Sequence, residues 1–399
     1  MKTLNYSIIG SGRRGEALVN GCLSKLDGAR CVAVCDVYPD KAEELAAVVM
    51  EKCGYKPKVF TDYKECLAYG SPDIAIIATS WDHHIDIAIY AMECGIAVGL
   101  EVGGAYSLDS LWQLVRCYER CKTPIMMLEN CCYGRLELLA LNMKRLGLLG
   151  RIVHCEGGYC HDLRHQVAHG IENRHYRHMQ YKLRCTDNYP THDLGPIAKL
   201  LDINCGNRFV SLHSTASLAV GMKEYCRDNG LTEYEDTTWN QGDIITTVLK
   251  CQNGETVTLT LDTTLPRYYS RRFMARGSRG IVAEDGKMVY LESDVEDGEK
   301  FLPGGYMNVD GYYEKYDHPL WQGYTPQGGH GGMDYLMMKD FFDAVREGKP
   351  MPIDVYDIAT WMAVTVLSDM SIATGQTVYF PDFTDGAWLT RENTFLSGK

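Results

Sequence analysis

The histidines of this 399-residue chain are concentrated in one stretch, because more than half of the 12 lie between residues 154 and 192. His161 and His165 are four residues apart and His169 follows, a spacing that could place metal ligands on one helical face. No H-E-x-x-H motif or full set of zinc ligands accompanies them, so we predict no metal site. The simpler interpretation is a polar surface, which we expect for His165, His169, His175 and His178.

His192 stands apart because it belongs to the segment Tyr189-Pro190-Thr191-His192, with Pro196 close behind. The first proline biases the tyrosine before it towards an extended conformation, and Thr191 or His192 could begin the helix that follows. We expect a stiff turn that holds the imidazole in place. Such stiffness suits a general base or acid, so His192 is the candidate for proton transfer.

A glycine-rich segment near the N-terminus has the spacing of a dinucleotide-binding turn. An apolar run at residues 5–10 leads into Gly10-Ser11-Gly12-Arg13-Arg14-Gly15, and a helical pattern follows. Glycines let the backbone approach a pyrophosphate, and the helix start offers N–H groups and the positive end of the dipole. About 20 residues further on, Asp36 would accept hydrogen bonds from ribose hydroxyls and repel a 2′-phosphate. We therefore predict NAD rather than NADP; the plainer alternative is a glycine turn beside a surface aspartate.

The elements that position these groups alternate over the first 130 residues. Strands are expected at 30–36, 73–78, 97–101 and 124–128, and helices near 83–94 and 107–121. This alternation predicts a doubly wound parallel sheet, which binds ligands beyond the carboxyl ends of its strands. The residues at those ends are Thr79, Ser80, Trp81, Glu101, Val102, Glu129 and Asn130.

After about residue 150 the pattern predicts an α/β domain on an open, mainly antiparallel sheet. Two tight turns, Asn253-Gly254 and Asp285-Gly286, each join a pair of β-rich runs. The runs are 244–251 with 255–262, and 280–284 with 287–291, and helices are expected at 333–347 and 355–373.

Two further expectations concern the organisation of the chain. The Gly- and Tyr-rich segment 303–332 is long for a loop, and we expect an ordered lid there. We assign residues 1–130 to an NAD-binding domain and residues 131–399 to a substrate-binding and oligomerisation domain.

The composition narrows the class of protein. A formal net charge of −12 disfavours binding of nucleic acid, and no run approaches the roughly 18 apolar residues that span a membrane. The segment before the first strand leaves no room for a signal peptide. The 16 cysteines include no C-x-x-C pair, and we expect reduced, buried thiols at Cys31, Cys35, Cys94 and Cys117. We therefore expect a cytoplasmic protein.

The first 130 residues resemble the glucose–fructose oxidoreductase/inositol dehydrogenase (Gfo/Idh/MocA) superfamily. Its members pair a Rossmann domain with an open-sheet α/β domain, and usually carry Glu-Lys-Pro where this chain has Glu101-Val102-Gly103. Val102 cannot donate a proton or polarise a hydroxyl, which disfavours ordinary dehydrogenase chemistry.

Nearly the whole chain resembles glycoside hydrolase family 109, the NAD-dependent α-N-acetylgalactosaminidases. The most discriminating segments are Tyr189-Pro190-Thr191-His192 and the Gly-Gly-His-Gly-Gly-Met-Asp run at 328–334. Further matches are Glu101-Val102, Glu129-Asn130, Gly157-Gly158-Tyr159, Leu194-Gly195-Pro196 and Tyr269-Ser270-Arg271. The chain departs at 204–209, where it has Asn-Cys-Gly-Asn-Arg-Phe for Asn-Arg-Gly-Asp-Arg-Phe, and at 267–270, where it has Arg-Tyr-Tyr-Ser for Arg-Pro-Tyr-Ser. Hexose, anomer and aglycone therefore stay open.

The resemblance implies glycoside cleavage without net redox change. The sugar is transiently oxidised at C3, the C1 substituent is eliminated after loss of the C2 proton, water adds, and the hydride returns. By motif matching, His192 acts at the C3 hydroxyl, Tyr159 near C2 with Arg177 or His161 as cationic neighbour, and Tyr269 near the leaving group. Implied sugar contacts are Tyr189, Pro190, Thr191, Arg177 and Glu129. Implied cofactor contacts are Gly10, Gly12, Arg13, Arg14, Gly15, Asp36, Thr79, Ser80, Trp81, His84, Glu101, Val102 and Asn130.

Other interpretations stay open. Tyr159 and Tyr269 could simply pack at strand ends, Trp81 could cap the crevice, and Glu129 could orient backbone. The chain could instead be a sugar or polyol dehydrogenase that releases NADH, or a non-catalytic NAD-dependent sensor. From the family alone we expect a homo-oligomer that acts on small-molecule glycosides.

Overall fold

The structure is a computed structural model that describes residues 2–103, 105–234, 236–294 and 308–396. The chain folds into two compact units that are each assembled from separate stretches of sequence. The first comprises Met1–Tyr133, Gly323–Thr360 and Thr394–Lys399, and the second comprises Gly134–Gln322 and Trp361–Asn393. The assignment of residues 1–130 and 131–399 to separate domains stays a prediction, because neither unit is continuous in sequence.

The first unit is built on a six-stranded parallel sheet, which confirms the predicted doubly wound arrangement. The strand order is β3-β2-β1-β4-β5-β6, so the direction of winding reverses between β1 and β4. Ligands of such sheets bind at this switch point, outside the carboxyl ends of the strands. The strands are β1 Leu4–Ile9, β2 Ala29–Cys35, β3 Lys58–Phe60, β4 Ile74–Ile77, β5 Ala97–Leu100 and β6 Ile125–Met127.

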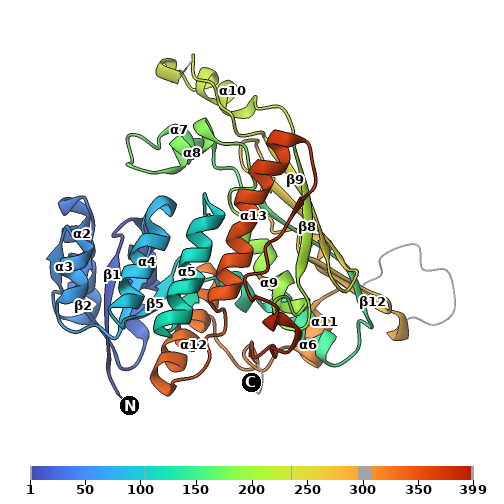
Figure 1. Cartoon of the computed structure of the whole chain (residues 1–399), viewed down its shortest axis with the longest axis horizontal. Coiled ribbons are helices and arrows are strands. Elements are labelled where there is room, and N and C mark those ends of the chain that lie inside the picture. Colours follow the sequence, from blue (N-terminus) through green and yellow to red (C-terminus); the bar gives the residue numbers. More distant parts are fainter. Residues whose placement is uncertain (1, 104, 235, 295–307, 397–399) are drawn as a thin grey trace. The chain divides into compact units, whose positions relative to one another are not determined.

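Most strands of this sheet are apolar and buried on both faces, so helices between them must cover the sheet. They are α1 Arg13–Gly21, α2 Pro39–Cys53, α3 Tyr63–Ala68, α4 His84–Glu93 and α5 Leu108–Cys121, with α12 Met333–Glu347 added from later in the chain. Every residue of β4, β5 and β6 is buried. Figure 1 shows the helices of this unit standing beside its strands.

The second unit is built on an eight-stranded, mainly antiparallel sheet, as predicted. Its order is β13-β12-β11-β7-β10-β9-β8-β14, and only β7 and β10 pair in parallel among these strands. The strands are β7 Ile152–Cys160, β8 Phe209–Ala216, β9 Ile244–Cys251, β10 Thr256–Asp262, β11 Met274–Gly277, β12 Gly280–Ala283, β13 Met288–Leu291 and β14 Val378–Tyr379. Both predicted hairpins are present, and Gly254 turns the first with φ of +102°.

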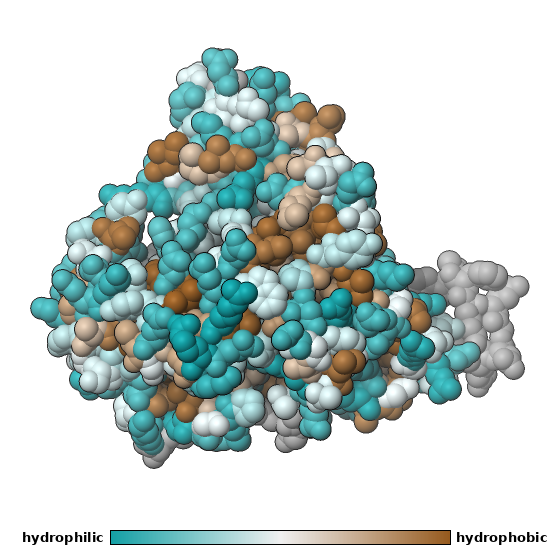
Figure 2. Space-filling view, in the orientation of Figure 1, coloured by the Kyte–Doolittle hydropathy of each residue, from teal (hydrophilic) through white to brown (hydrophobic). Residues whose placement is uncertain are grey.

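The helices of the second unit are mostly short. They are α6 Arg135–Arg145, α7 Arg164–Ala168, α8 Arg177–Leu183, α9 Thr191–Leu200, α10 Gly221–Asp228 and α11 Asp310–Tyr316. The long helix α13 Val355–Thr374 carries the chain from the first unit into the second. The face seen in Figure 2 is largely hydrophilic, with hydrophobic side chains in small groups. None of the helices in the described ranges has the length and apolar character needed to span a membrane.

Several sequence expectations need correction. The segment 303–332 is not one lid loop: its described part contains α11, and the chain passes from the second unit to the first at Gly323, while residues 303–307 lie outside the described residues. His178 is buried rather than at the surface, and its Nδ1 lies 2.9 Å from the Val167 carbonyl oxygen. Cys94 is exposed, although Cys31, Cys35 and Cys117 are buried as expected. The helices α2 and α3 and the strand β3 were missed.

Candidate functional site

The three glycines of the N-terminal motif meet three different steric requirements. Gly10 has φ of +99°, and a Cβ there would lie 2.4 Å from the carbonyl of Ala78. A Cβ on Gly15 would lie 2.4 Å from the carbonyl oxygen of Gly10, so helix and turn can pack only through glycine. A Cβ on Gly12 would meet nothing within 4 Å. The turn therefore leaves open space where a pyrophosphate would approach the start of α1.

The N-terminus of α1 is not capped by the side chain of its N-cap residue. Gly12 occupies the N-cap position and makes no side-chain capping bond, and Arg13 and Arg14 are the first helical residues. The backbone N–H groups of a first helical turn have no partners within the helix, so they suit an anion. This part of the chain fits the diphosphate of a dinucleotide.

Asp36 follows β2 directly, as predicted. Its carboxylate accepts hydrogen bonds from the backbone N–H groups of Ser11 at 2.7 Å and Tyr38 at 3.0 Å. These bonds fix the half-buried carboxylate against the glycine turn. Two carboxylate oxygens retain lone pairs for further donors, so Asp36 fits the hydroxyls of a ribose.

An ionic network centred on the buried carboxylate of Asp334 lies beside the glycine turn, and it includes His330 and Asp334, to which the sequence assigned no role. Arg14 donates from Nε to Glu101 at 2.7 Å and from its two terminal nitrogens to Asp334 at 2.9 and 3.1 Å. Asp334 also accepts from Asn130 Nδ2 at 2.8 Å and lies 2.9 Å from His330 Nδ1. Burial alone would raise the pKa of Asp334, but the His330 hydrogen bond and the Arg14 charge hold it below its usual range. The network thus joins α1 to the ends of β5 and β6 and to the start of α12.

His330 and Asp334 were visible in the sequence only as members of the Gly-Gly-His-Gly-Gly-Met-Asp run. The glycines of that run explain the close approach, because a Cβ on Gly328 would lie 2.2 Å from the Gly21 carbonyl oxygen. A Cβ on Gly329 would lie 2.6 Å from an Asp334 carboxylate oxygen. The run is therefore shaped to bring α12 against α1.

The loops after β4 and β5 pack on each other. Trp81 is buried, and a Cβ on Gly103 would lie 2.3 Å from its ring. Val102 is also buried, so an apolar side chain stands at the position next to Glu101. His84 Nε2 lies 3.1 Å from the Thr79 carbonyl oxygen, and burial lowers the pKa of His84 to about 4. His84 is therefore neutral near pH 7 and holds the loop through Thr79.

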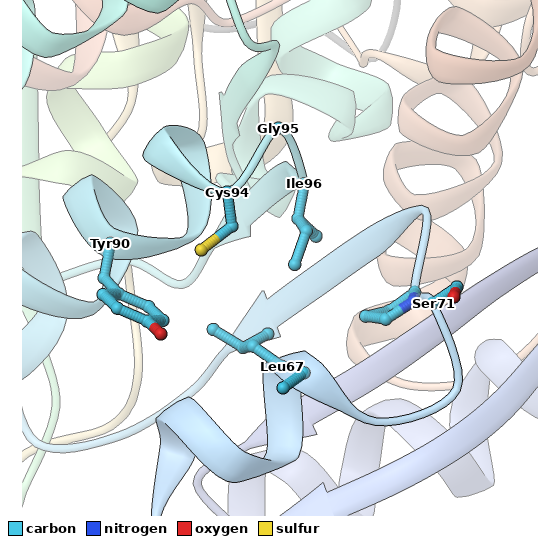
Figure 3. Close-up of a pocket in the computed structure, with 8 residues that line it drawn as sticks. Leu67, Ser71, Tyr90, Cys94, Gly95 and Ile96 are labelled. Atoms are coloured by element: carbon cyan, nitrogen blue, oxygen red, sulfur yellow. The ribbon is translucent and has the colours of Figure 1, made fainter.

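A hollow elsewhere on the first unit is separate from these residues. It lies between α3 and α4 and is lined by Leu67, Ser71, Tyr90, Cys94, Gly95 and Ile96 (Figure 3). Ser71 precedes β4, and Cys94, Gly95 and Ile96 precede β5. The hollow therefore lies at the amino ends of these strands, opposite to the edge that binds dinucleotides.

In the second unit, a cluster of aromatic rings gathers beside the end of β7. The ring of Tyr159 lies 4.3 Å from that of Tyr189 and 5.7 Å from that of His192, centroid to centroid. The Tyr189 hydroxyl lies 3.5 Å from His192 Nε2. His161 stacks 6.0 Å from Tyr159 and lies 5.5 Å from Tyr269. The structure therefore brings together all three predicted catalytic residues of this cluster, two phenols and one imidazole.

His192 is positioned by a helix rather than by the stiff turn that we expected. Thr191 begins α9, with Pro190 at its N-cap position, and Pro196 lies inside the helix. The helix lies against β7 where a Cβ on Gly157 would be 2.7 Å from the Asp193 Cβ. Glycine at this strand position thus permits the approach that brings His192 to Tyr159.

Arg177 provides the positive charge of the cluster. It begins α8, is 8% exposed, and its Cζ lies 5.1 Å from the centroid of the Tyr189 ring. One terminal nitrogen donates to Gln166 Oε1 at 2.8 Å, a residue that the sequence did not single out. Burial alone would lower the pKa of Arg177, but the hydroxyls of surrounding tyrosines, including Tyr159 and Tyr189, raise it above its ordinary value. Burial lowers the pKa of His161, and Arg177 adds to the shift, so His161 is neutral near pH 7.

The remaining predicted sugar contact lies in the first unit. Glu129 is buried directly after β6, and its Oε1 accepts the backbone N–H of Cys131 at 3.0 Å. Thr79 and Ser80 are half-buried in the loop after β4. The predicted cofactor residues thus all belong to the first unit, and the predicted catalytic residues all belong to the second.

Comparisons with known proteins agree with this division. A family model described as an oxidoreductase family with an NAD-binding Rossmann fold matches residues 4–127. A model described as the C-terminal domain of glycosyl hydrolase 109 matches residues 133–390.

Solved structures with this fold include dehydrogenases of sugars and cyclitols. Levoglucosan dehydrogenase, in complex with NADH and levoglucosan, superposes with a TM-score of 0.69 at 19% identity, over 95% of this chain and all of that one. A myo-inositol 2-dehydrogenase from Lactobacillus plantarum gives 0.67 at 16% identity, over 95% and 100%. The fold, the glycine turn and Asp36 together define an NAD-binding protein of the Gfo/Idh/MocA type.

Relatives found by sequence have a higher identity to this chain than these solved structures do. An α-N-acetylgalactosaminidase from Tannerella forsythia is 38% identical over 98% of this chain and 88% of its own length. A glycosyl hydrolase family 109 protein from Parabacteroides distasonis is 37% identical over 98% and 89%. The chain belongs to glycosyl hydrolase family 109, and its first unit is an NAD-binding domain.

Proposed function

We propose that the chain is an NAD-dependent α-N-acetylgalactosaminidase that cleaves its glycoside through transient oxidation at C3. The observation that carries this proposal is the cluster of Tyr159, Tyr189 and His192, with Arg177 beside Tyr189, in a protein whose other unit has a glycine turn fit for NAD. The name of the Tannerella forsythia relative supports the substrate.

The residues of the first unit would hold the cofactor. Gly10, Gly12 and Gly15 admit the diphosphate, and Asp36 accepts the ribose hydroxyls. When bound, the nicotinamide supplies the acceptor, and later the donor, of the hydride at sugar C3. Val102 adds no proton-transfer group there, so the acid–base chemistry falls to the second unit.

His192 would take the proton of the C3 hydroxyl as the ketone forms, because imidazole is the side chain that most often serves as a general base in enzymes. A C3 ketone acidifies the proton on C2, and Tyr159 would remove it. The C2 electron pair then forms the C1–C2 double bond while the bond from C1 to the aglycone oxygen breaks. To act as this base Tyr159 must first lose its own proton, and Arg177 would stabilise the resulting phenolate, since it lies among these tyrosines.

Tyr269 would protonate the departing oxygen, and it is suited to this by its exposure of 47% beside the cluster. Water then adds to C1, the C2 proton returns, and the ketone is reduced again at C3. Tyr189, Pro190, Thr191 and Glu129 would contact the sugar.

Hydrolysis in deuterated water tests this mechanism. With p-nitrophenyl α-N-acetylgalactosaminide we expect release of p-nitrophenol, deuterium at C2 of the sugar and no net NADH. Hydrolysis without exchange at C2 would contradict the mechanism. Steady NADH production from free sugars, with glycosides inert, would select the sugar or polyol dehydrogenase instead.

A substitution of His192 tests the role of the imidazole. His192→Gln should lower kcat on the same glycoside by about 10²–10³-fold, because a general base is lost. The variant should retain NAD as measured by mass spectrometry, since His192 belongs to the other unit. An unchanged kcat would leave the histidine a structural role, whereas NAD binding without turnover in the unsubstituted protein would favour the non-catalytic sensor.

Two further proposals concern the setting of the enzyme. We propose a cytoplasmic protein, supported by 16 cysteines that are all free thiols in the structure. We also propose a homo-oligomer that does not bind nucleic acid, supported by the half-exposed Thr246, Val248 and Thr258 on one face of the eight-stranded sheet and by the net charge of −12. Light scattering on the purified protein tests the oligomer.

A further inference from the structure

A rigid loop with exposed aromatic side chains lies beside the aromatic cluster. It comprises residues 263–270, which follow β10, and is called the aromatic loop below. Both of its ends are buried at Thr263, Thr264 and Ser270, whereas Tyr268 is 77% exposed and Tyr269 is 47% exposed. Two neighbouring tyrosines in water are unusual at a loop tip that packing and hydrogen bonds hold so closely.

The aromatic loop is anchored at both ends. At its start, the Thr264 hydroxyl donates to Asp243 at 2.6 Å. At its end, Ser270 and Cys160 exchange backbone hydrogen bonds of 3.0 and 3.2 Å, one residue beyond Tyr159. The position of the tip is therefore tied directly to the strand that carries the candidate base.

The ring of Tyr268 is supported from one side. The Arg267 guanidinium carbon lies 5.3 Å from the ring centroid, a cation–π contact. Arg267 is itself held by bonds to the Tyr268 carbonyl oxygen at 2.8 Å and to Asp262 at 2.6 Å. Because Asp262 balances the charge of Arg267, the loop offers a neutral aromatic surface rather than an anion site.

The aromatic loop opens on the same edge of the sheet as the cluster. β10 runs parallel to β7, so their carboxyl ends coincide, and Tyr269 at the loop tip contacts His161 after β7. The candidate group for the leaving oxygen, Tyr269, is the immediate neighbour of Tyr268. A group attached to that oxygen would therefore lie beside the aromatic loop, where Tyr268 is the more exposed of the two tyrosines.

We propose that Tyr268 is an aglycone-binding platform that takes a neutral hexopyranose on the leaving-group side of the scissile bond. The C–H face of a pyranose is apolar and flat enough to stack on an exposed phenol ring, while its hydroxyls stay in water. The inference rests on the proposed function, since it names the substrate class of the same site. The natural substrate would then be an oligosaccharide rather than a simple glycoside.

The test compares two substrates that differ only in the aglycone. One is methyl α-N-acetylgalactosaminide, and the other is a disaccharide in which the same sugar is α-linked to galactose. Tyr268→Ala should lower kcat/KM for the disaccharide relative to the methyl glycoside by about tenfold, mainly through KM. Tyr268→Phe should preserve the ratio, because the ring remains.

Tyr379→Ala is the matched control, because Tyr379 is 74% exposed on β14 in the same unit, and it should leave the ratio unchanged. An unchanged ratio in Tyr268→Ala, with both substrates cleaved, would overturn the platform and leave the glycosidase intact. If the unsubstituted enzyme cleaves neither substrate, the proposed function fails and the platform fails with it.

Discussion

Asp187, two residues before Tyr189, has a buried carboxyl group in the second unit. It is 2% exposed, its Oδ2 has no hydrogen-bond partner, and burial raises the pKa of Asp187 to about 7. The Tyr189 backbone N–H and the Thr247 hydroxyl oppose this shift only in part. The backbone N–H of Asp187 donates to the Ser368 hydroxyl on α13, so the chain just before the Tyr-Pro-Thr-His segment is tied to a long helix. The segment carrying the candidate base is therefore coupled to a titrating group.

This coupling predicts a dependence of stability on pH. The folded-state pKa of Asp187 exceeds the unfolded value near 3.8, so folding binds a proton and stability falls as pH rises from about 4 to 7. Asp187→Asn should remove this loss, so that between pH 5 and pH 8 the variant gains about 2.5 kcal/mol of unfolding free energy relative to the unsubstituted protein. Urea unfolding at pH 5 and at pH 8 measures this change in the free energy of unfolding.

The control for this experiment is Asp228→Asn, which changes an exposed aspartate on α10. It should leave the pH profile of stability as it is. Parallel profiles for the unsubstituted protein and Asp187→Asn would show that Asp187 ionises normally in the folded state.

At the scale of elements, the ionic network of the first unit fastens α12 to α1. Asp334 is fully buried and receives Arg14, Asn130 and His330, so it joins three segments of the chain. Removal of this carboxylate is costly, because Arg14 and Asn130 then lose the charged acceptor of their hydrogen bonds.

Asp334→Asn should therefore lower the free energy of unfolding by about 3 kcal/mol at pH 7 and weaken NAD binding. The pKa of Asp334 lies below its usual range, so the contribution is present above about pH 4 and is lost as pH falls further. Denaturant unfolding and calorimetric titration with NAD measure the two effects. Asp343→Asn on the same helix, where the carboxylate pairs with Lys339 and Arg346 at the surface, should cost at most about 1 kcal/mol. Equal losses in both variants would refute a special role for Asp334.

The sequence predicted elements best where the signal was local. The glycine turn and Asp36 depend on neighbours within one strand–helix–strand unit, and both lie where expected. The contact between Arg14 and Asp334 spans 320 residues, and no local pattern announces it. His178 was expected at the surface but is buried, and Cys94 was expected to be buried but is exposed. Tertiary packing, not composition, decides which side of a short helix is covered. Thr191 begins α9, as one of the two residues expected to start that helix, whereas the stiff turn expected around His192 is the first turn of the helix, because proline suits both.

At the scale of the whole molecule, the predicted cofactor residues and the candidate acid–base residues belong to different units. The proposed mechanism returns the hydride in every cycle, so it needs no exchange of NAD. We expect NAD to remain bound through purification, and a mass spectrum under denaturing conditions should detect it.

Removal of the cofactor gives the matching prediction. Protein stripped of NAD should lose glycosidase activity, and added NAD should restore the activity and raise the melting temperature, because a ligand that binds only the folded state stabilises it. Thermal unfolding and p-nitrophenol release follow the two recoveries. Apoprotein that cleaves the glycoside as fast as the reconstituted enzyme would exclude the redox mechanism.

The interleaving of the units along the chain has a consequence for biosynthesis. A ribosome delivers the parallel sheet early, yet Asp334 and the remainder of α12 emerge only after nearly the entire second unit has been made. Arg14 cannot form its hydrogen bonds to Asp334 before that point. We therefore expect the contact between Arg14 and Asp334 to complete the first unit only after most of the chain has left the ribosome.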